Sequence, residues 1–315
     1  MQRTVGPVAI TGSSGFLGKW VLHELVGRGL PRESLRLGSS REFDLRDPDA
    51  CRNFVRGSKV VIHLAARVGG IGYHVGRASQ MFVENLMMGI NVLRAAKEEG
   101  VEYVLISGTA CSYPDEVEVP LLESDLWSGR PTGETAPYGM AKRTLQYAGE
   151  TFSESGDLKV GFVIPTNLYG PEDHFDTQTS HVIPALIARF EKIRLAGGHV
   201  LDVWGDGSAT RDFLYVADAA SGIVDAVEAR LVKPINLGSG EEVTIARLAR
   251  EIANAVFAGG AFQLSFDKAK PVGARRRALD YSTANDLLHW SPSVTLSEGL
   301  SATVDWYRTN RPHLT

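Results

Sequence analysis

Tyr138 and Lys142 are the two residues whose types and spacing point most directly to chemistry. Residues four apart lie one turn from each other on a helix face, so Tyr138-Gly139-Met140-Ala141-Lys142 brings a phenol beside an ammonium. Because a neighbouring positive charge favours the phenolate, we expect the pKa of Tyr138 to fall from about 10 towards neutrality. Thr109, just after a predicted strand, could hydrogen-bond the same reacting oxygen. This pattern predicts proton transfer at an oxygen, although the same spacing occurs by chance on amphipathic helices.

A glycine-rich turn follows the short apolar run Val8–Ile10. The segment Thr11-Gly12-Ser13-Ser14-Gly15-Phe16-Leu17-Gly18 stands between this run and a helical pattern. Such a turn lets the main chain and the positive end of a helix approach a pyrophosphate, although it can also be a plain strand–helix turn. Together with Tyr138 and Lys142, it predicts hydride transfer between a dinucleotide and a carbon that bears oxygen.

The residues after the second predicted strand favour NADP(H) over NAD(H). NAD sites place a carboxylate there to hold the ribose 2′-hydroxyl, whereas this strand ends in Leu37-Gly38-Ser39-Ser40-Arg41. Two hydroxyls and the Arg41 guanidinium suit a 2′-phosphate, with a solvated loop charge as the alternative for Arg41. Asp44 and Leu45 are expected to contact the adenine.

Composition excludes several classes of function. The chain has 315 residues with 33 basic and 37 acidic side chains, a net charge of −4, which argues against nucleic-acid or membrane-surface binding. Two cysteines are too few for a disulfide framework, and we expect a reducing compartment. We recognise no signal peptide and no apolar run of about 18 residues, so we expect a cytoplasmic protein without membrane contact and without a bound metal.

The elements that must position these residues alternate between strands and helices, which predicts an α/β fold with a doubly wound parallel sheet. A smaller C-terminal lobe is expected to bind the substrate. We predict a dinucleotide-binding domain at 1–165 with a return segment at about 213–238, and a lobe formed by 166–212 and 239–315. The expected strands, all buried on both faces in the first half, are 8–10, 35–37, 60–64, 104–106, 160–164, 200–204, 213–216 and 235–237. The expected helices are 16–26, 81–98, 138–153, 181–196, 217–229 and 244–256.

Three longer sequence blocks connect the chain with a known family. Leu64-Ala65-Ala66-Arg67-Val68-Gly69-Gly70-Ile71, Pro165-Thr166-Asn167-Leu168-Tyr169-Gly170-Pro171 and Ser180-His181-Val182-Ile183-Pro184-Ala185-Leu186 are much less common than a glycine turn. With them, the chain resembles the extended short-chain dehydrogenase/reductases and, within these, the GDP-L-fucose synthase family. The resemblance implies NADPH-dependent 3,5-epimerisation and 4-reduction of a GDP-4-keto-6-deoxy sugar. It also implies that Cys111 and His181 are the epimerisation acid and base, in an order that we leave open.

Thiol and imidazole pKa values of about 8.5 and 6.5 bracket neutrality, so one group can donate a proton while the other accepts. Tyr138 and Thr109 would stabilise the enolate at O4, and Lys142 would orient the nicotinamide ribose. The family further implies a homodimer formed by the helices 81–98 and 138–153. The expected cofactor-binding residues are Gly12, Ser14, Gly15, Phe16, Leu17, Gly18, Ser39, Ser40, Arg41, Asp44, Leu45, Leu64, Ala65, Ala66, Lys142, Pro165, Asn167, Leu168 and His181. The expected substrate-binding residues are Asn167, Val182, Leu186, Arg189, Trp204, Arg211 and Arg277.

Departures from the family pattern leave alternatives open. Thr109 stands where the family usually has serine, and the loop 118–134 keeps only the general pattern, so a related sugar such as a 6-deoxyheptose is an alternative substrate. A sugar-nucleotide 4-epimerase would not need the Cys111–His181 pair. A 4,6-dehydratase would carry an Asp-Glu pair where this chain has Ala110-Cys111. A non-catalytic NADP(H)-sensing protein is the alternative from another class.

Overall fold

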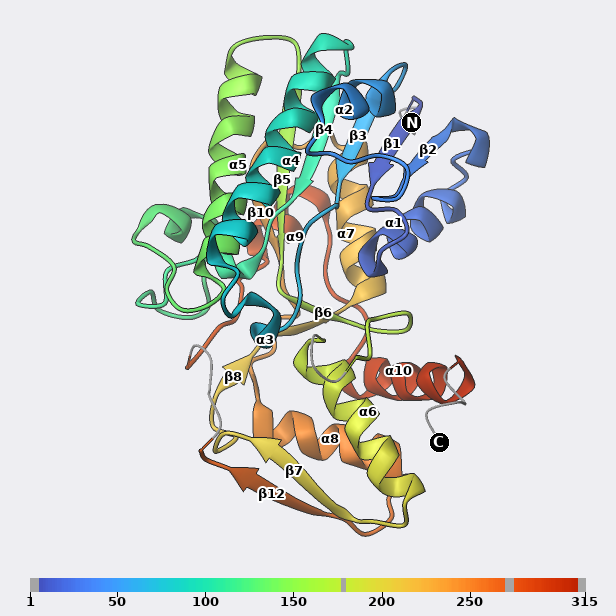
Figure 1. Cartoon of the computed structure of the whole chain (residues 1–315), viewed down its shortest axis with the longest axis vertical. Coiled ribbons are helices and arrows are strands. Elements are labelled where there is room, and N and C mark those ends of the chain that lie inside the picture. Colours follow the sequence, from blue (N-terminus) through green and yellow to red (C-terminus); the bar gives the residue numbers. More distant parts are fainter. Residues whose placement is uncertain (1–5, 177–179, 270–274, 311–315) are drawn as a thin grey trace.

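A six-stranded parallel sheet dominates the computed structural model, which describes residues 6–176, 180–269 and 275–310 (Figure 1). The strands lie in the order β10-β5-β4-β3-β1-β2. Their bounds are β1 Val8–Thr11, β2 Leu35–Gly38, β3 Val60–His63, β4 Tyr103–Ser107, β5 Lys159–Pro165 and β10 Ile235–Leu237. The strand order reverses between β1 and β3, which is where doubly wound sheets bind ligands. The predicted α/β fold is confirmed.

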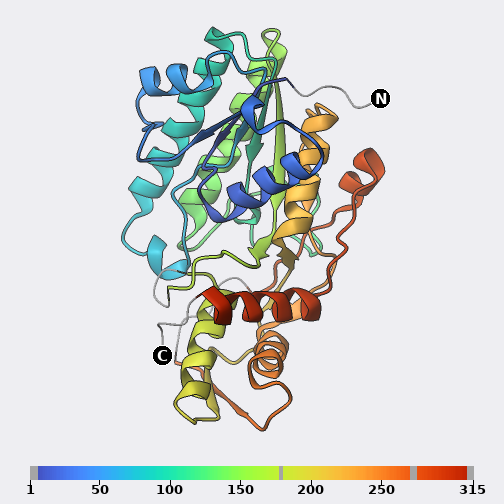
Figure 2. The same cartoon turned by 90° about the vertical axis from the view of Figure 1, so that its right-hand side faces the viewer.

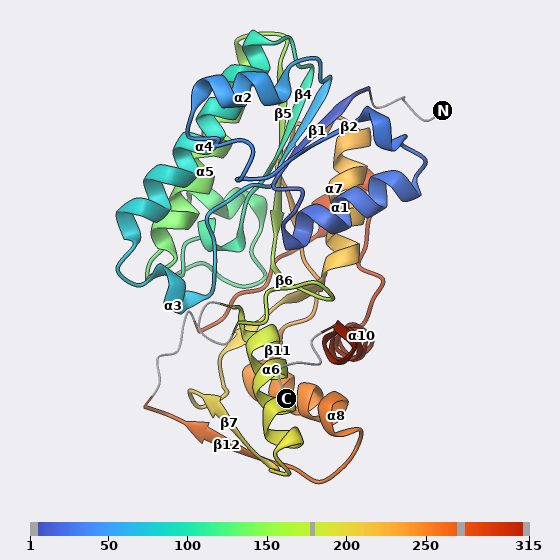
Figure 3. The ribbon, with the colours of Figure 1, turned by 45° about the vertical axis from the view of Figure 1, so that its right-hand side comes forward.

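Helices cover both faces of this sheet (Figure 3). One face carries α1 (Phe16–Gly27) and α7 (Val216–Glu228), and the other carries α2 (Pro48–Val55), α4 (Ala78–Glu98) and α5 (Ala136–Glu154). Successive strand residues point to opposite faces: Val8 and Ile10 belong to one apolar core and Ala9 to the other. Burial on both faces explains why the central strands are continuous apolar runs.

Two details in this half differ from the expectation. The run 35–37 was predicted to be buried on both faces, and this was wrong: Arg36 is exposed and both leucines are only partly buried. The reason is that β2 is the outermost strand. Helix α2 was not predicted because it has only eight residues and a mixed composition; its start is fixed by Pro48 in the first turn and by the Asp47 carboxylate, which accepts from the Asp49 N–H.

Most of the remaining chain forms a smaller lobe below the carboxyl ends of the strands (Figures 1 and 2), whereas α9 (Ser282–Leu288) packs against β10 and α7 beside the sheet. Its own apolar core lies among α6 (Val182–Leu195), α8 (Ile245–Phe257) and α10 (Leu296–Asn310). Three strand pairs complete it: β7 (Val200–Trp204) with β12 (Gln263–Asp267), β8 (Thr210–Arg211) with β11 (Val243–Thr244), and β6 (Asn167–Tyr169) with β9 (Phe213–Tyr215). Within the described ranges, no helix combines the length and apolar character that crossing a bilayer requires.

Asp212 joins this lobe to the sheet. Its main-chain carbonyl accepts hydrogen bonds from the Thr166 hydroxyl (3.1 Å) and the Asn167 side-chain amide (2.9 Å), directly after β5. Its fully buried carboxylate accepts from the Ser239 N–H (2.9 Å) and hydroxyl (2.6 Å) and from the Leu279 N–H (3.2 Å). A single residue therefore holds together three chain segments that lie far apart in the sequence.

Candidate active site

A cavity of about 1020 Å³ lies beyond the carboxyl ends of the strands, where the glycine-rich turn and α5 face the smaller lobe. This volume is at the upper end of the range for small-molecule sites, as an extended dinucleotide plus a second ligand would require. Most of the residues predicted from the sequence line it. They are Gly12, Ser14, Gly15, Phe16, Leu17, Gly18, Ser39, Ser40, Asp44, Leu45, Leu64, Ala65, Ala66, Thr109, Cys111, Tyr138, Lys142, Pro165, Asn167, Leu168, His181, Arg211 and Arg277.

The glycine-rich turn has a geometry that only glycine allows. Gly12 has φ +71°, and a β-carbon on it would lie 2.8 Å from the Ala65 nitrogen. A β-carbon on Gly18 would lie 2.1 Å from the Gly12 carbonyl oxygen, so α1 packs directly on the turn. The bare main chain and the first turn of α1 therefore face the cavity, which fits a dinucleotide pyrophosphate.

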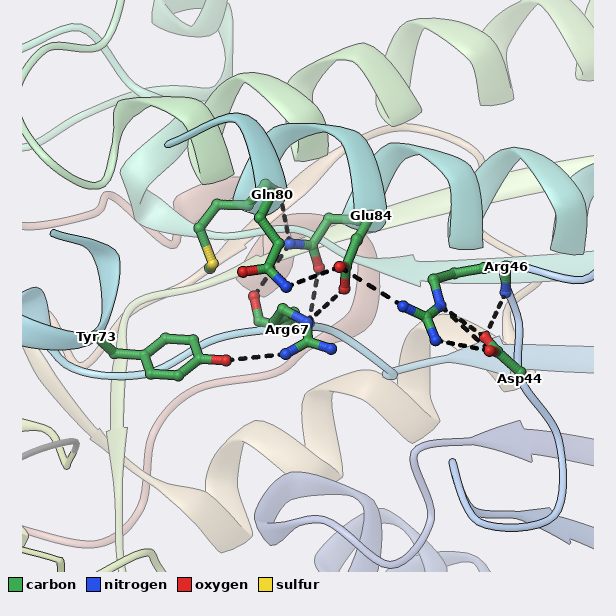
Figure 4. Close-up of polar contacts among 8 residues, drawn as sticks. Asp44, Arg46, Arg67, Tyr73, Gln80 and Glu84 are labelled. Carbon is green, nitrogen blue, oxygen red and sulfur yellow. Dashed lines mark hydrogen bonds and ion pairs between the residues drawn. The ribbon is translucent and has the colours of Figure 1, made fainter. Parts of the chain in front are cut away.

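Charged residues that sequence reasoning did not select line the cavity near Asp44 (Figure 4). The Arg46 guanidinium donates to both oxygens of Asp44 (2.9 and 2.7 Å), and this contact lowers the pKa of Asp44 to about 2. Glu84 on α4 accepts from Arg67 Nε (2.5 Å) and lies 3.6 Å from Arg46 Nη1. Arg67 also donates to the Tyr73 hydroxyl (3.2 Å). This network fixes Asp44 beside the predicted adenine position.

Arg41, expected to bind a 2′-phosphate, lies on the exposed turn after β2 and does not line the cavity. Ser39 and Ser40 do line it, and the Ser39 hydroxyl donates to Glu42 (2.9 Å). A contact from Arg41 to a 2′-phosphate therefore requires its side chain to turn inward, and this role stays a prediction.

Tyr138 and Lys142 lie in α5 and are almost fully buried, with exposed fractions of 6% and 1%. The expected lowering of the Tyr138 pKa was wrong. Burial raises that pKa above its usual value of 10, and the nearby Cys111 adds to the effect. Burial also lowers the pKa of Lys142 to about 8. Tyr138 is thus a neutral phenol with a proton to donate.

Thr109 and Cys111 are placed by the short 3₁₀ turn η2 (Ala110–Ser112), which follows β4. The Thr109 hydroxyl oxygen caps this turn by accepting from the Cys111 N–H at 3.2 Å. Because the oxygen is the acceptor in that bond, the hydroxyl proton is available to a ligand in the cavity. Cys111 is partly exposed and has no disulfide, as expected for a proton-transfer group.

His181 directly precedes α6 and reaches the same cavity from the smaller lobe. Its side chain is exposed to the cavity, and partial desolvation by the protein packed around it lowers its pKa. His74 and His174 lower the pKa of His181 further, because a charge on either of them would repel the His181 imidazolium. The lowered pKa favours the neutral imidazole, which is the form that can accept a proton.

Two arginines supply positive charge at this end of the cavity. Arg211 donates to the Thr210 carbonyl (2.7 Å), and Arg277 pairs with Asp115, which also lines the cavity. Asp115 accepts from the Thr132 hydroxyl as well. The neighbouring Arg276 is exposed and forms an ion pair with Glu242 (2.6 Å), so the triple-arginine run divides into residues with different surroundings.

Four predicted substrate-binding residues lie outside the cavity wall. Leu186 is buried in the core of the smaller lobe, and Val182 packs against that core. Arg189 donates to the Asp202 carbonyl (2.9 Å) and lies 5.6 Å over the Trp204 ring. These four residues lie on α6 and β7, and their contacts with a ligand stay predictions.

His74 is a cavity residue that the sequence analysis did not select. It lines the wall together with Asp115, Thr132 and Glu134, none of which belongs to a recognisable motif. Spacing rules cannot find such residues, because the loops after β3 and β4 bring them together only in the folded chain.

The fold and site define the class of protein. The model of the NAD dependent epimerase/dehydratase family matches residues 8–238, which include the glycine-rich turn, Thr109 and the Tyr138–Lys142 pair. The chain belongs to this family.

Individual relatives make the assignment narrower. The chain is 35% identical to GDP-L-fucose synthase 1 of Arabidopsis thaliana over 319 residues, covering 98% of this chain and 95% of the relative. It is 34% identical to the GDP-L-fucose synthase of Escherichia coli (96% and 97%) and 32% identical to the GDP-L-colitose synthase of Yersinia pseudotuberculosis (95% and 97%). The structure of a GDP-L-fucose synthetase from Naegleria fowleri bound to NADP superposes with a TM-score of 0.85 at 28% identity, covering 97% of this chain and 95% of that one. The predicted resemblance to GDP-L-fucose synthases is confirmed.

Proposed function

We propose that this enzyme uses NADPH to epimerise C3 and C5 and to reduce C4 of a GDP-linked 4-keto-6-deoxy sugar, giving GDP-L-fucose. The observation that carries the proposal is the single cavity lined by Tyr138, Lys142, Thr109, Cys111 and His181 beyond the glycine-rich turn. The relatives named GDP-L-fucose synthase support the choice of substrate.

Inversion of a carbon beside a ketone needs a proton acceptor and a proton donor on opposite faces. Neutral His181 and the Cys111 thiol serve as this pair, in either order. Thr109 and Tyr138 donate hydrogen bonds to the O4 oxygen, where negative charge develops when the proton leaves. Two such inversions, at C3 and C5, precede reduction.

Reduction uses the same tyrosine as an acid. NADPH, held by the glycine-rich turn and by Ser39, Ser40, Asp44 and Leu45, supplies a hydride to C4. Tyr138 gives its proton to O4, consistent with the raised pKa of the buried phenol. Lys142 orients the nicotinamide ribose. Its positive charge also stabilises the phenolate that Tyr138 becomes when it gives up its proton.

The division of labour follows the two lobes. The domain 1–165, with the return segment at about 213–238, is proposed to hold NADP(H), and 166–212 with 239–315 to hold the sugar nucleotide.

We also propose a homodimer in the cytoplasm. Helices α4 and α5 lie side by side (Figure 1) and expose Val83 (47%), Met87 (43%) and Tyr147 (59%), which fits an apolar contact with a second copy. Sedimentation as a monomer at micromolar concentration would count against the dimer.

A related nucleotide sugar is the second candidate substrate. The chain is 32% identical to a GDP-L-colitose synthase over nearly its whole length, which is close to its 34–35% identity with the GDP-L-fucose synthases of Escherichia coli and Arabidopsis thaliana. This similarity to an enzyme of a different GDP-sugar favours the alternative. The methyl group that distinguishes Thr109 from serine narrows the pocket beside the reacting carbon.

Incubation with NADPH and a GDP-4-keto-6-deoxy sugar tests the proposal. We expect loss of NADPH absorbance and a product whose NMR spectrum shows inversion at C3 and C5. Oxidation without inversion favours a simple 4-reductase, and inversion without oxidation an epimerase. Binding of NADPH with no oxidation favours an NADP(H)-sensing protein.

A further inference from the structure

His74 is the last residue of the short helix α3 (Ile71–His74), in the loop that follows β3. Its side chain is only 2% exposed and lies in the wall of the cavity. The imidazole and the Tyr138 ring lie with their centroids 5.9 Å apart at 58°. His74 is thus the side chain next to the proposed proton donor, although the chemistry described so far gives it no task.

Hydrogen bonding decides which nitrogen of His74 carries the proton. Nε2 lies 3.1 Å from the Gly69 carbonyl oxygen, and a carbonyl can only accept, so Nε2 bears the hydrogen. Nδ1 is then a lone-pair acceptor. Among the described residues it has no hydrogen-bond partner, although it is buried.

The neutral form of this imidazole is favoured. Burial lowers the pKa of His74, while the Gly69 carbonyl and the charge of Glu134 act in the opposite direction. A buried acceptor without a donor costs stability, so a site beside a ligand cavity calls for a ligand donor.

We propose that Nδ1 of His74 accepts a hydrogen bond from the C3 hydroxyl of the substrate sugar and thereby positions the ring beside Tyr138. The inference rests on the proposed function, in which Tyr138 acts at O4. Because the His74 ring contacts the Tyr138 ring, a sugar whose O4 lies at Tyr138 would bring the carbons next to C4 close to His74. Of the two adjacent carbons, C5 carries the ring oxygen and the methyl group, neither of which is a donor, whereas C3 carries a hydroxyl. Because Nδ1 is buried, a neighbouring side chain in the cavity wall has to turn aside as the sugar enters, while His74 keeps its bond to the Gly69 carbonyl.

Two substitutions separate the two nitrogens. Glutamine places its terminal amide near the position of Nε2, so His74→Gln keeps a donor for the Gly69 carbonyl but removes the acceptor at Nδ1. Asparagine places its amide near Nδ1, so His74→Asn restores an acceptor there. We expect His74→Gln to raise the KM for the 4-keto sugar nucleotide about tenfold with a smaller change in kcat, and His74→Asn to recover most of this loss. His23→Gln, at an exposed position of α1, is the matched control.

A substrate analogue without the C3 hydroxyl makes the test specific. If the hydroxyl is the donor, wild type and His74→Gln bind the 3-deoxy analogue equally well, because the interaction is absent from both. Equal weakening of both ligands by His74→Gln, or an unchanged KM, overturns the proposal. So does a change in NADPH affinity without a change in sugar affinity, since His74 would then contact the cofactor.

Calorimetric binding of the two sugar nucleotides gives the same comparison without turnover. If the wild type binds them but does not oxidise NADPH, the proposed function fails while the His74 contact is still decided by the binding data. If the wild type turns over and the His74 variants match it, only the His74 inference fails.

Discussion

Gly139 packs against the main chain of Cys111: a β-carbon on this glycine would lie 2.0 Å from the Cys111 carbonyl oxygen. The Ser112 hydroxyl also donates to the Gly139 carbonyl at 3.0 Å. This contact locks the turn η2, which carries the thiol, to the helix that carries Tyr138. The spacing between the proposed reduction and epimerisation groups is therefore set by a residue that has no side chain.

Gly139→Ala should disturb both activities, because the added methyl group must push η2 away from α5. We expect a loss of about 1–3 kcal/mol in the free energy of unfolding and a marked fall in turnover. Urea denaturation and NADPH oxidation measure the two effects. Gly27→Ala is the matched control, since a β-carbon at that position in α1 meets nothing within 4 Å. Wild-type activity in Gly139→Ala would contradict the packing argument.

Cys111→Ala should leave reduction intact and block epimerisation, since the thiol is assigned to proton transfer alone. Product stereochemistry by NMR is the measurement. Cys51→Ala removes the other thiol, which is fully buried on α2, and should still give an inverted sugar. An inverted product from Cys111→Ala removes this cysteine from the mechanism.

Lys142→Met should abolish hydride transfer and stabilise the fold at neutral pH. Folding lowers the pKa of Lys142 from 10.5 to about 8, so below pH 8 the buried ammonium costs on the order of 3 kcal/mol. Between about pH 8 and 10.5 the unfolded state binds more protons than the native state. The wild type therefore gains stability as pH rises through this window, and the advantage of Lys142→Met shrinks.

Urea denaturation of both proteins at pH 7 and pH 10 checks this sign. An advantage of Lys142→Met that grows with pH would show that the ammonium is stabilised inside the protein rather than penalised.

Arg41→Ala should reduce the preference for NADPH over NADH at least tenfold, because a charge-assisted contact with the 2′-phosphate is lost. The ratio of kcat/KM values for the two cofactors is the measurement. Arg46→Ala is the comparison: Arg46 is held by Asp44 beside the predicted adenine, so its loss should weaken both cofactors alike. A selective loss of NADPH in Arg46→Ala instead would transfer the phosphate contact to that residue.

The sheet could be predicted because all its strands except the edge strand β2 are buried on both faces. Runs such as Val60-Val61-Ile62 are apolar without interruption, and the glycine-rich turn marks where β1 ends. The strand pairs of the smaller lobe were harder: β8 and β11 have two residues each and depend on partners far away in the sequence. Helix α10 was missed although its buried residues recur three and four apart, which is the spacing of an amphipathic helix.

For the site, motifs located the residues but not their surroundings. The spacing of Tyr138 and Lys142 correctly predicted a shared helix, yet it could not reveal how deeply α5 is buried, and burial decides both pKa values. The position of His74 beside Tyr138 could not be predicted either. The two residues are 64 positions apart in the sequence, and spacing patterns relate only residues that are close together in the chain.

The hydrogen bonds by which the buried Asp212 joins the smaller lobe to the sheet affect the stereochemistry of the product. Every residue proposed for reduction lies on the sheet side of Asp212, whereas His181 approaches from the smaller lobe, directly before α6. The configuration of the product at C3 and C5 therefore depends on how the sheet domain and the smaller lobe are aligned. Hydride delivery to C4 depends on the sheet domain alone. Loosening the hydrogen bonds of Asp212 should accordingly yield mixtures of diastereomers before it slows the consumption of reductant.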